Sequence, residues 1–117
     1  MRCLITDDSK LARKVLKTSL SKYIDEENIY EANDGLAALK LLLQEKFDIV
    51  FLDLTMPVMN GYEAIPKLLD IQPDIKIVVV SADVQQKAKE RVLALGASVH
   101  MEKPIKDLRI KEILEAL

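Results

Sequence analysis

The chain has 117 residues, of which 50% are apolar and 31% are charged, so it is long enough for one folded domain and too apolar for a disordered segment. Its 17 basic and 19 acidic residues give a net charge of −2, which argues against general binding to a nucleic-acid backbone. A single cysteine excludes an internal disulfide framework, and no apolar run approaches the ~18 residues of a membrane-spanning helix. The N-terminus also lacks the apolar core of a signal peptide, and we therefore expect a cytoplasmic protein.

Five short apolar runs recur along the chain and predict five β-strands. They cover residues 3–5, 29–32, 47–54, 75–80 and 97–101. The third and fourth runs are rich in β-branched residues and almost uninterrupted by polar ones, as expected for strands that are buried on both faces.

The segments between these runs repeat apolar residues at helical spacing and predict five helices. They cover residues of about 9–23, 36–46, 60–71, 84–95 and 104–117. The first helix is predicted to bury one stripe, which consists of Leu11, Val15, Leu16 and Leu20. The last helix is predicted to bury Ile105, Leu108, Ile113, Leu114 and Leu117. Strands that alternate with helices predict an α/β protein with a doubly wound parallel sheet.

Capping and helix-breaking residues predict where three of these helices begin or end. Asp83 is predicted to cap the start of the fourth helix, and Gly96 to end it. Pro104 is predicted to occupy the first turn of the last helix. Pro66 removes a backbone hydrogen bond inside the third helix, so that helix is expected to kink or to begin late.

Polar residues follow four of the five predicted strands. Asp7 and Asp8 follow the first strand, Asp53 the third, Ser81 the fourth and Lys103 the fifth. Because parallel strands of a doubly wound sheet end at one side, where ligands bind, we expect these side chains to form one site. Taken singly, each has an ordinary role as a helix cap, a turn residue or a solvated charge, but these roles do not explain why four strands end in this way.

The chemistry of this site follows from its charges. Three carboxylates and one ammonium leave a net charge of about −2, and two like charges ~4 Å apart repel by roughly 4 kcal/mol at an effective dielectric of about 20. Oxygen ligands without imidazoles or further thiolates favour Mg²⁺ over zinc as the cation that relieves this repulsion. A carboxylate can also attack a phosphoryl group to form an acyl phosphate, whose oxygens Ser81 and Lys103 would bind. The spacing alone does not show which aspartate would be the nucleophile.

The same residues belong to a set of short motifs that extends along the chain. These motifs are Asp7-Asp8, Asp53-Leu54-Thr55-Met56-Pro57-Val58-Met59-Asn60-Gly61, Ser81-Ala82, Gly96-Ala97 and Lys103-Pro104. In this order and spacing they resemble the receiver domains of two-component response regulators, which have the flavodoxin-like fold of CheY. The resemblance covers residues 1–117, implies one receiver domain, and implies a five-stranded sheet with the strand order 2-1-3-4-5.

The resemblance also implies roles for individual residues. Asp53 would accept a phosphoryl group from a histidine kinase or a histidine phosphotransfer protein. Mg²⁺ would be held by the side chains of Asp7, Asp8 and Asp53 and by the backbone carbonyl of Thr55. Lys103 would contact the phosphoryl group, and Ser81 would be the switch hydroxyl that moves toward it. In the family, the peptide bond before the proline that matches Pro104 is usually cis.

Three positions depart from the family or vary within it. His100 occupies the position of an aromatic switch residue, and it is either an ordinary residue of an edge strand or a smaller partner of the Ser81 switch. Thr55 and Asp83 occupy positions that tune dephosphorylation in the family. The resemblance therefore does not predict the lifetime of the acyl phosphate.

We expect a single-domain response regulator that catalyses only its own phosphorylation and dephosphorylation. It would signal to a protein target through the fourth helix, fifth strand and fifth helix, whose mixed charges suit a protein better than DNA or a membrane. One alternative is a phosphorelay intermediate, and another is a receiver excised from a DNA-binding regulator. A third alternative is a metal-dependent phosphohydrolase on a related fold, which requires an acid/base two residues after the nucleophile, where Thr55 cannot serve.

Overall fold

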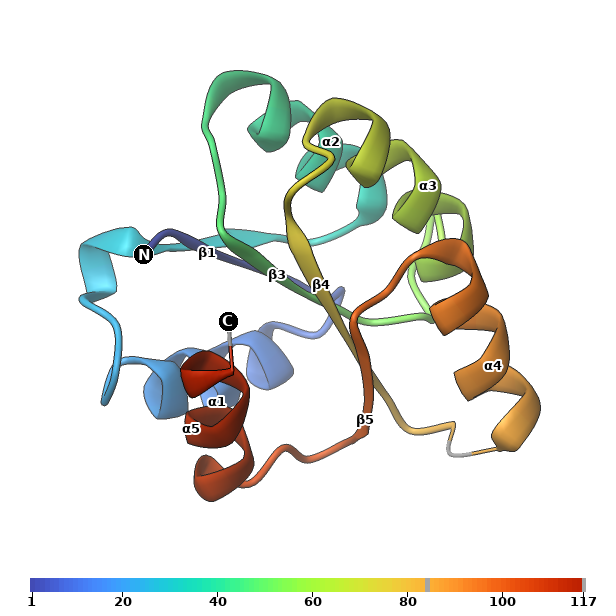
Figure 1. The fold of residues 1–117 in the computed structure, drawn as a ribbon. Coiled ribbons are helices and arrows are strands. Elements are labelled where there is room, and N and C mark those ends of the chain that lie inside the picture. Colours follow the sequence, from blue (N-terminus) through green and yellow to red (C-terminus); the bar gives the residue numbers. More distant parts are fainter. Residues whose placement is uncertain (84, 117) are drawn as a thin grey trace.

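The computed structural model describes residues 1–83 and 85–116, and in that part of the chain five strands form one parallel sheet (Figure 1). The strands are β1 (Cys3–Thr6), β2 (Ile29–Ala32), β3 (Ile49–Leu52), β4 (Lys76–Ser81) and β5 (Val99–Glu102). The helices are α1 (Lys10–Leu20), α2 (Gly35–Gln44), α3 (Gly61–Ile71), α4 (Gln86–Leu95) and α5 (Asp107–Glu115), with a short 3₁₀ turn η1 (Glu26–Asn28). The strand order is β2-β1-β3-β4-β5, which confirms both the predicted fold class and the order.

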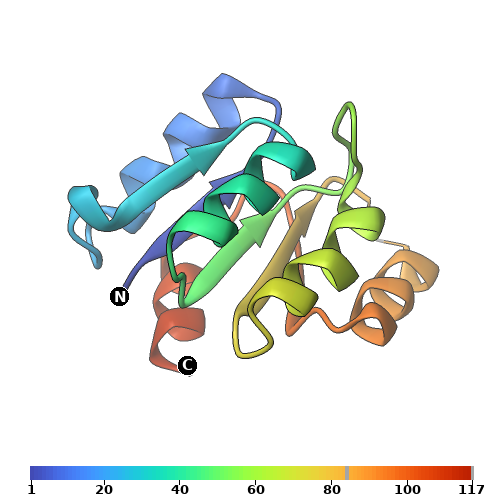
Figure 2. The ribbon, with the colours of Figure 1, turned by 90° about the horizontal axis from the view of Figure 1, so that it is seen from above.

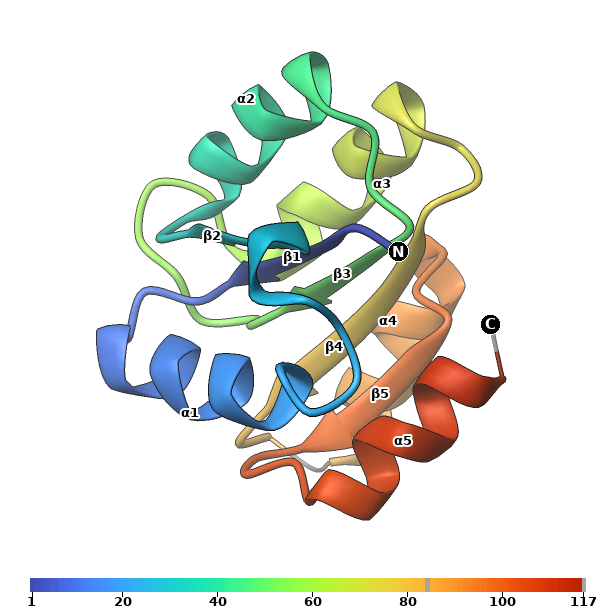
Figure 3. The same cartoon turned by 90° about the vertical axis from the view of Figure 1, so that its left-hand side faces the viewer.

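The helices cover both faces of the sheet. α1 and α5 lie on one face and α2, α3 and α4 on the other (Figures 1 and 3), and Figure 2 looks onto this second face. Ile5 and Phe51 point into the core beneath α1 and α5, whereas Leu4 and Val50 point into the core beneath α2 and α3. Alternate residues of the same strand thus enter different apolar cores, which explains why the central runs contain almost no polar residue.

The predicted apolar stripe of α1 is only partly buried. Leu20 is buried and Leu16 packs against the core, but Leu11 is 72% exposed and Val15 is also exposed. The reason is the position of α5, whose first residue, Asp107, accepts a hydrogen bond from Ser19 near the far end of α1. No helix of residues 1–83 and 85–116 therefore covers the first half of α1 on that side. An apolar groove of about 280 Å³ remains there, lined by Leu11 and Val15 on one side and floored by residues of the sheet.

Two predicted helix starts are wrong. The fourth helix begins at Gln86, and the carboxylate of Asp83 accepts from the backbone N–H of Gln85 (2.9 Å) in a turn before the helix instead of capping it. Val84, where this helix was predicted to begin, lies outside the described residues. The last helix begins at Asp107, because β5 extends to Glu102 and the chain needs several further residues to leave the sheet.

Pro104 accordingly lies in the loop before α5, and not in its first turn. The peptide bond between Lys103 and Pro104 is cis, as the resemblance implied. Within α5 the buried residues are Ile110 and Ile113, and Leu108 is exposed because it lies on the opposite side of the helix. Leu117, also predicted to be buried, lies outside the described residues.

The third helix is continuous from Gly61 to Ile71 and includes Pro66, so the late start is wrong. Its first turn is capped by Asn60, whose side-chain oxygen accepts from the N–H of Glu63 (2.9 Å). Among the residues that the structure describes, no helix has the length and apolar character that crossing a bilayer requires.

Candidate functional site

Three aspartates meet at the carboxyl end of the sheet, where the strands terminate. β1 and β3 are neighbours with Thr6 opposite Leu52, so the residues that follow these strands are also neighbours. One carboxylate oxygen from each of Asp7, Asp8 and Asp53 lies within 4.8 Å of the others. Asp7 and Asp53 are buried, whereas Asp8 is exposed. The structure thus brings together the three predicted metal ligands that act through their side chains.

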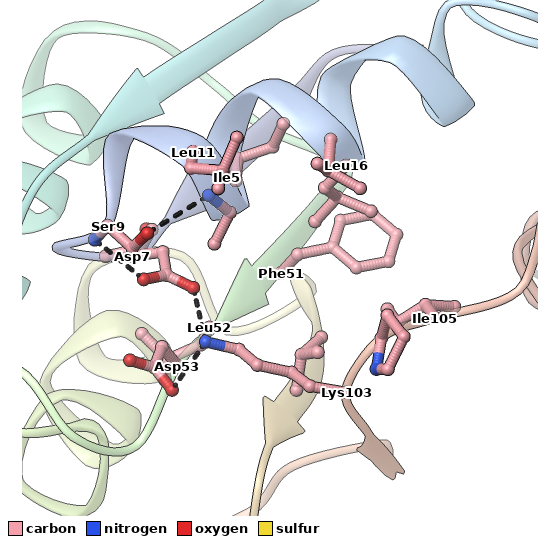
Figure 4. Close-up of a pocket in the computed structure, with 15 residues that line it drawn as sticks. Ile5, Asp7, Ser9, Leu11, Leu16, Phe51, Leu52, Asp53, Lys103 and Ile105 are labelled. Atoms are coloured by element: carbon pink, nitrogen blue, oxygen red, sulfur yellow. Dashed lines mark hydrogen bonds and ion pairs between the residues drawn. The ribbon is translucent and has the colours of Figure 1, made fainter.

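Lys103 reaches this acidic cluster from the loop after β5. Its backbone N–H donates to the carbonyl of Ser81 (3.0 Å), which holds the loop against the end of β4. Its Nζ donates to Oδ2 of Asp7 (2.6 Å) and lies 3.3 Å from Oδ1 of Asp53 (Figure 4). One ammonium is therefore shared by two buried carboxylates.

The charges of the site shift two pKa values. Burial and the negative charge of Asp7 raise the pKa of Asp53, although Lys103 opposes the rise. Burial acts to lower the pKa of Lys103, but its hydrogen bond to Asp7 and the charges of Asp53 and Asp7 outweigh this and raise it. Lys103 therefore stays charged at neutral pH, and the carboxylates still exceed the available positive charge.

Backbone contacts fix the position of Asp7. Its Oδ1 accepts from the N–H of Ser9 (2.9 Å), and its carbonyl accepts from the guanidinium of Arg13 (2.7 Å). Arg13 also pairs with Glu31 on β2, so it ties the loop after β1 to the neighbouring strand. Arg13 is not predicted from the sequence, since a basic residue on a helix carries no signal of a contact with a backbone carbonyl in the preceding loop.

Gly61 closes the loop that follows Asp53. Its N–H donates to the carbonyl of Leu54 (2.9 Å), and a Cβ added to it would lie 2.6 Å from the carbonyl oxygen of Asp53. A side chain at this position would push the loop away from the acidic cluster. Gly61 was part of the sequence motif, but only the structure gives the reason for a glycine there.

The other predicted site residues lie on adjoining segments. Ser81 is buried at the end of β4, and its hydroxyl accepts from the N–H of Asp83 (3.0 Å). Thr55 and Asp83 are exposed, on the loops after β3 and β4. His100 is half-buried on β5 and pairs in register with Val79, which places it on the same face of the sheet as Ser81. Its Nε2 is buried without a hydrogen-bond partner in the described structure, which does not suit an ordinary exposed residue.

The donor set suits a Mg²⁺ ion. Two oxygens that share one Mg²⁺ at about 2.1 Å lie at most about 4.2 Å apart, so small side-chain rotations would suffice for Asp7, Asp8 and Asp53 to share one. The side chains that could hold the ion are all carboxylates, which favours Mg²⁺ over zinc or copper. Asp8 is exposed, and this leaves an open side for water or a phosphoryl oxygen.

A parallel sheet in the order β2-β1-β3-β4-β5, with an acidic cluster and a lysine at its carboxyl end, defines a CheY-like protein of the flavodoxin-like fold class. The profile of the response regulator receiver domain matches residues 3–115. The chain belongs to the response regulator receiver family.

Several known proteins resemble the chain along nearly its whole length. It is 38% identical to the chemotaxis protein CheY of Thermotoga maritima over 113 residues, which cover 97% of this chain and 93% of that one. It is 36% identical to the chemotaxis protein CheY of Listeria monocytogenes over 115 residues, or 98% and 96% of the two chains. A response regulator from Burkholderia pseudomallei, solved with a phosphorylated aspartic acid, a calcium ion and citrate, is 28% identical with a TM-score of 0.84 and matches 99% of this chain and 65% of that one.

Proposed function

We propose that this protein is a phosphorylation-activated signalling protein that accepts a phosphoryl group on Asp53 from a phosphohistidine of a histidine kinase or phosphotransfer protein, in a reaction that requires Mg²⁺. The observation that carries the proposal is the ammonium of Lys103, which lies between Asp7 and Asp53 at the edge of a three-carboxylate cluster. The phosphorylated aspartic acid and calcium ion of the B. pseudomallei structure support the same chemistry.

The contacts of the three aspartates favour Asp53 as the nucleophile. Both oxygens of Asp7 are engaged, Oδ1 by Ser9 and Oδ2 by Lys103. Asp53 has one oxygen near Lys103, and its Oδ2 has no hydrogen-bond partner among the described residues. Asp8 is exposed and thus keeps its carboxylate in water. Asp53 is the carboxylate that is both buried and open to attack.

In the proposed reaction, Oδ2 of Asp53 attacks the phosphorus and the phosphorus–nitrogen bond of the donor phosphohistidine breaks. The electron pair of that bond returns to the imidazole, which leaves and is then protonated. Lys103 neutralises negative charge on the transferred group from the Asp53 side. When bound by Asp7, Asp8, Asp53 and the carbonyl of Thr55, Mg²⁺ supplies further charge neutralisation for the phosphoryl oxygens. The protein acts once on itself in this step and is not an enzyme that turns over a separate substrate.

Ser81 would transmit the phosphorylation of Asp53 to the rest of the protein. Among the described residues its hydroxyl is held by the N–H of Asp83, so a new acceptor on Asp53 can draw it away. His100 lies on the same face of the sheet and would fill the space that Ser81 leaves, while Thr55 and Asp83 would tune dephosphorylation. A cytoplasmic protein target would then bind the surface of α4, β5 and α5, whose charges are mixed. A phosphorelay intermediate uses the same site, and transfer from phospho-Asp53 to a second histidine protein distinguishes it.

The proposal is tested by intact mass spectrometry after incubation with a small-molecule phosphodonor. We expect the wild-type protein to gain one phosphoryl group in Mg²⁺ and none in a chelator. Asp53→Asn should gain none. The matched control is Asp74→Asn, an exposed aspartate that precedes β4 at the other end of the sheet, and it should be labelled like the wild type. Equal labelling of Asp53→Asn and wild type would show that the nucleophile is another residue.

A further inference from the structure

The outer side of α2 is unusual among the helices because it is apolar and exposed. Lys40 is the one charged residue of α2, whereas α1, α3, α4 and α5 each carry three or more. Leu36 is 40% exposed and Leu43 is 72% exposed, and both point away from the core that Ala38 and Leu42 enter. A surface helix ordinarily places charged residues on that side. The apolar side chains of α2 therefore exceed what its packing on the sheet requires.

The exposed leucines are spaced as in a helix that packs against a second helix. Leu36, Leu39 and Leu43 occur at positions i, i+3 and i+7, which is the spacing of a coiled-coil seam. Leu39 is partly buried against the core and borders the other two. Lys40, at i+4, lies on the same outer stripe midway between Leu36 and Leu43. A single positive charge thus lies beside the seam, near the middle of its length.

The loop after β3 extends this apolar area. Met59 packs so closely on Gly35, the first residue of α2, that a Cβ on Gly35 would lie 3.0 Å from the Met59 side chain. The loop accordingly stands beside the start of α2 (Figures 2 and 3). Its neighbouring residue, Val58, is 75% exposed and has a φ of 67°, a conformation that β-branched residues rarely adopt. An exposed valine in this conformation adds strain and buries little apolar surface, and such strain is found at binding sites.

We propose that the α2 face, defined as Leu36, Leu39, Lys40, Leu43 and Val58, binds an acidic amphipathic helix of another protein. The leucines supply the apolar contact, and Lys40 pairs with an aspartate or glutamate beside the partner's own seam. A second copy of this chain suits the face less well. In an antiparallel pair of copies related by a twofold axis at this seam, Lys40 lies against its counterpart, and like charges in a contact repel.

The four residues of this site on α2 lie apart from the acidic cluster and from the surface of α4, β5 and α5, whereas Val58 lies on the loop that also carries Asp53. The proposal does not require phosphorylation of Asp53, so its test and the phosphorylation test can fail independently. The unphosphorylated protein of 117 residues is therefore the right material for the experiment.

The probe is a synthetic helical peptide of about 20 residues, long enough to be helical in water, with a leucine seam and a central glutamate. A second peptide carries lysine in place of that glutamate. Each is titrated into isotope-labelled protein below the concentration at which the peptide self-associates, and backbone amide shifts are followed by NMR. We expect the glutamate peptide to shift residues 36–43 and 58–59 and to bind about tenfold more tightly than the lysine peptide.

Variants of the α2 face give the sharper readout. Leu43→Gln should weaken binding of the glutamate peptide about tenfold, whereas Leu108→Gln, an equally exposed leucine on α5, should leave it unchanged. Lys40→Glu should reverse the preference between the two peptides, which non-specific apolar adhesion would not do. Absence of shifts on α2, shifts centred elsewhere, or an unreversed preference would each overturn the proposal. So would a dimer of the wild-type chain in sedimentation that Leu43→Gln dissociates, because the occupant would then be a second copy.

Discussion

The two ends of the sheet differ in whether their polar groups are satisfied within the protein. At the amino end, the amide of Gln72 donates to the carbonyls of Leu42 (2.9 Å) and Glu45 (2.7 Å) and accepts from the N–H of Phe47 (2.9 Å). This neutral side chain joins the ends of α2 and α3 to the start of β3, and its polar groups are satisfied. At the carboxyl end, three carboxylates crowd together, two of them share the ammonium of Lys103, and the pKa of Asp53 is raised.

The amino end of the sheet thus serves stability, and the carboxyl end serves function. The amino end holds the helices on the sheet with hydrogen bonds that need no ligand. The carboxyl end keeps unfavourable charge and a strained Val58 in place, and only a cation, a phosphoryl group or a partner can relieve them. Removal of the Gln72 amide at one end and of the Asp53 charge at the other should consequently change stability in opposite directions.

The largest expected effect on stability is at the amino end. Gln72→Ala removes three hydrogen bonds and leaves the N–H of Phe47 without its partner, so the free energy of unfolding should fall by about 3 kcal/mol. Urea titration measures this loss. The control is Gln86→Ala, on the exposed side of α4, which should change stability by less than about 0.5 kcal/mol. Phosphorylation of the folded Gln72→Ala protein should match the wild type, and impaired labelling would show that the two ends are coupled.

Asp53→Asn should change the free energy of unfolding in the opposite direction to Gln72→Ala. In a chelator it removes one of three crowded charges at nearly constant volume, so the free energy of unfolding should rise by about 1–2 kcal/mol. Because the folded-state pKa of Asp53 is raised above 3.8, ionised Asp53 destabilises the fold at neutral pH. The gain from Asp53→Asn should therefore shrink as the pH falls through the folded-state pKa toward 3.8, since Asp53 then takes up a proton in the native protein.

Thermal melts at neutral and acidic pH, each with and without Mg²⁺, measure this effect. Mg²⁺ should raise the melting temperature of the wild type more than that of Asp53→Asn, because the variant has lost one ligand. A variant that is less stable than the wild type in the chelator would refute the repulsion between the carboxylates.

Lys103→Met tests the ammonium that pairs with the carboxylates of the site. It keeps the length of the apolar stem but removes the ammonium that Asp7 and Asp53 share, so the metal-free protein should lose about 1 kcal/mol of stability. The contribution of Lys103 is complete below its usual pKa of 10.5 and should disappear as the pH rises through its raised folded-state pKa. Calorimetric titration should show Mg²⁺ binding that is unimpaired or tighter, and weaker binding would mean that Lys103 organises the carboxylates.

Val58→Asn is expected to have the smallest effect. Asparagine tolerates a positive φ better than valine does, so this variant should gain about 0.5–1 kcal/mol. Urea titration against the wild type checks the gain, and Val15→Asn on the exposed part of α1 controls for the change of polarity. A loss of stability would show that the loop holds Val58 through packing that outweighs its strain.

The sequence predicted most of the acidic site, for a physical reason. Asp7, Asp8, Asp53 and Lys103 follow strands that end at one side of a parallel sheet, so topology alone brings them together. Arg13 and Gln72 were not predicted, because their contacts depend on which backbone groups the loops bring near them. No pattern in one sequence encodes that.

The incorrect predictions have other causes. Leu11 and Val15 were assigned to the core from helical spacing, which shows that a helix has an apolar side but not whether another element covers it. Leu108 was assigned to the core as well, but it lies on the side of α5 opposite the buried Ile110. On α1 the cover is missing because α5 lies beside the far half of the helix. Asp83 and Pro104 have the composition of helix starts, but the strands before them extend further and delay both helices.

The central claim is an acyl phosphate on Asp53, and hydroxylamine trapping tests it most directly. Hydroxylamine displaces the phosphate of an acyl phosphate and leaves a hydroxamate, which peptide mass spectrometry assigns to one residue. After treatment with a small phosphodonor and Mg²⁺, we predict a hydroxamate on Asp53 and unmodified Asp7 and Asp8. A hydroxamate on either of those residues, or a phosphoryl group that resists hydroxylamine, would contradict the account.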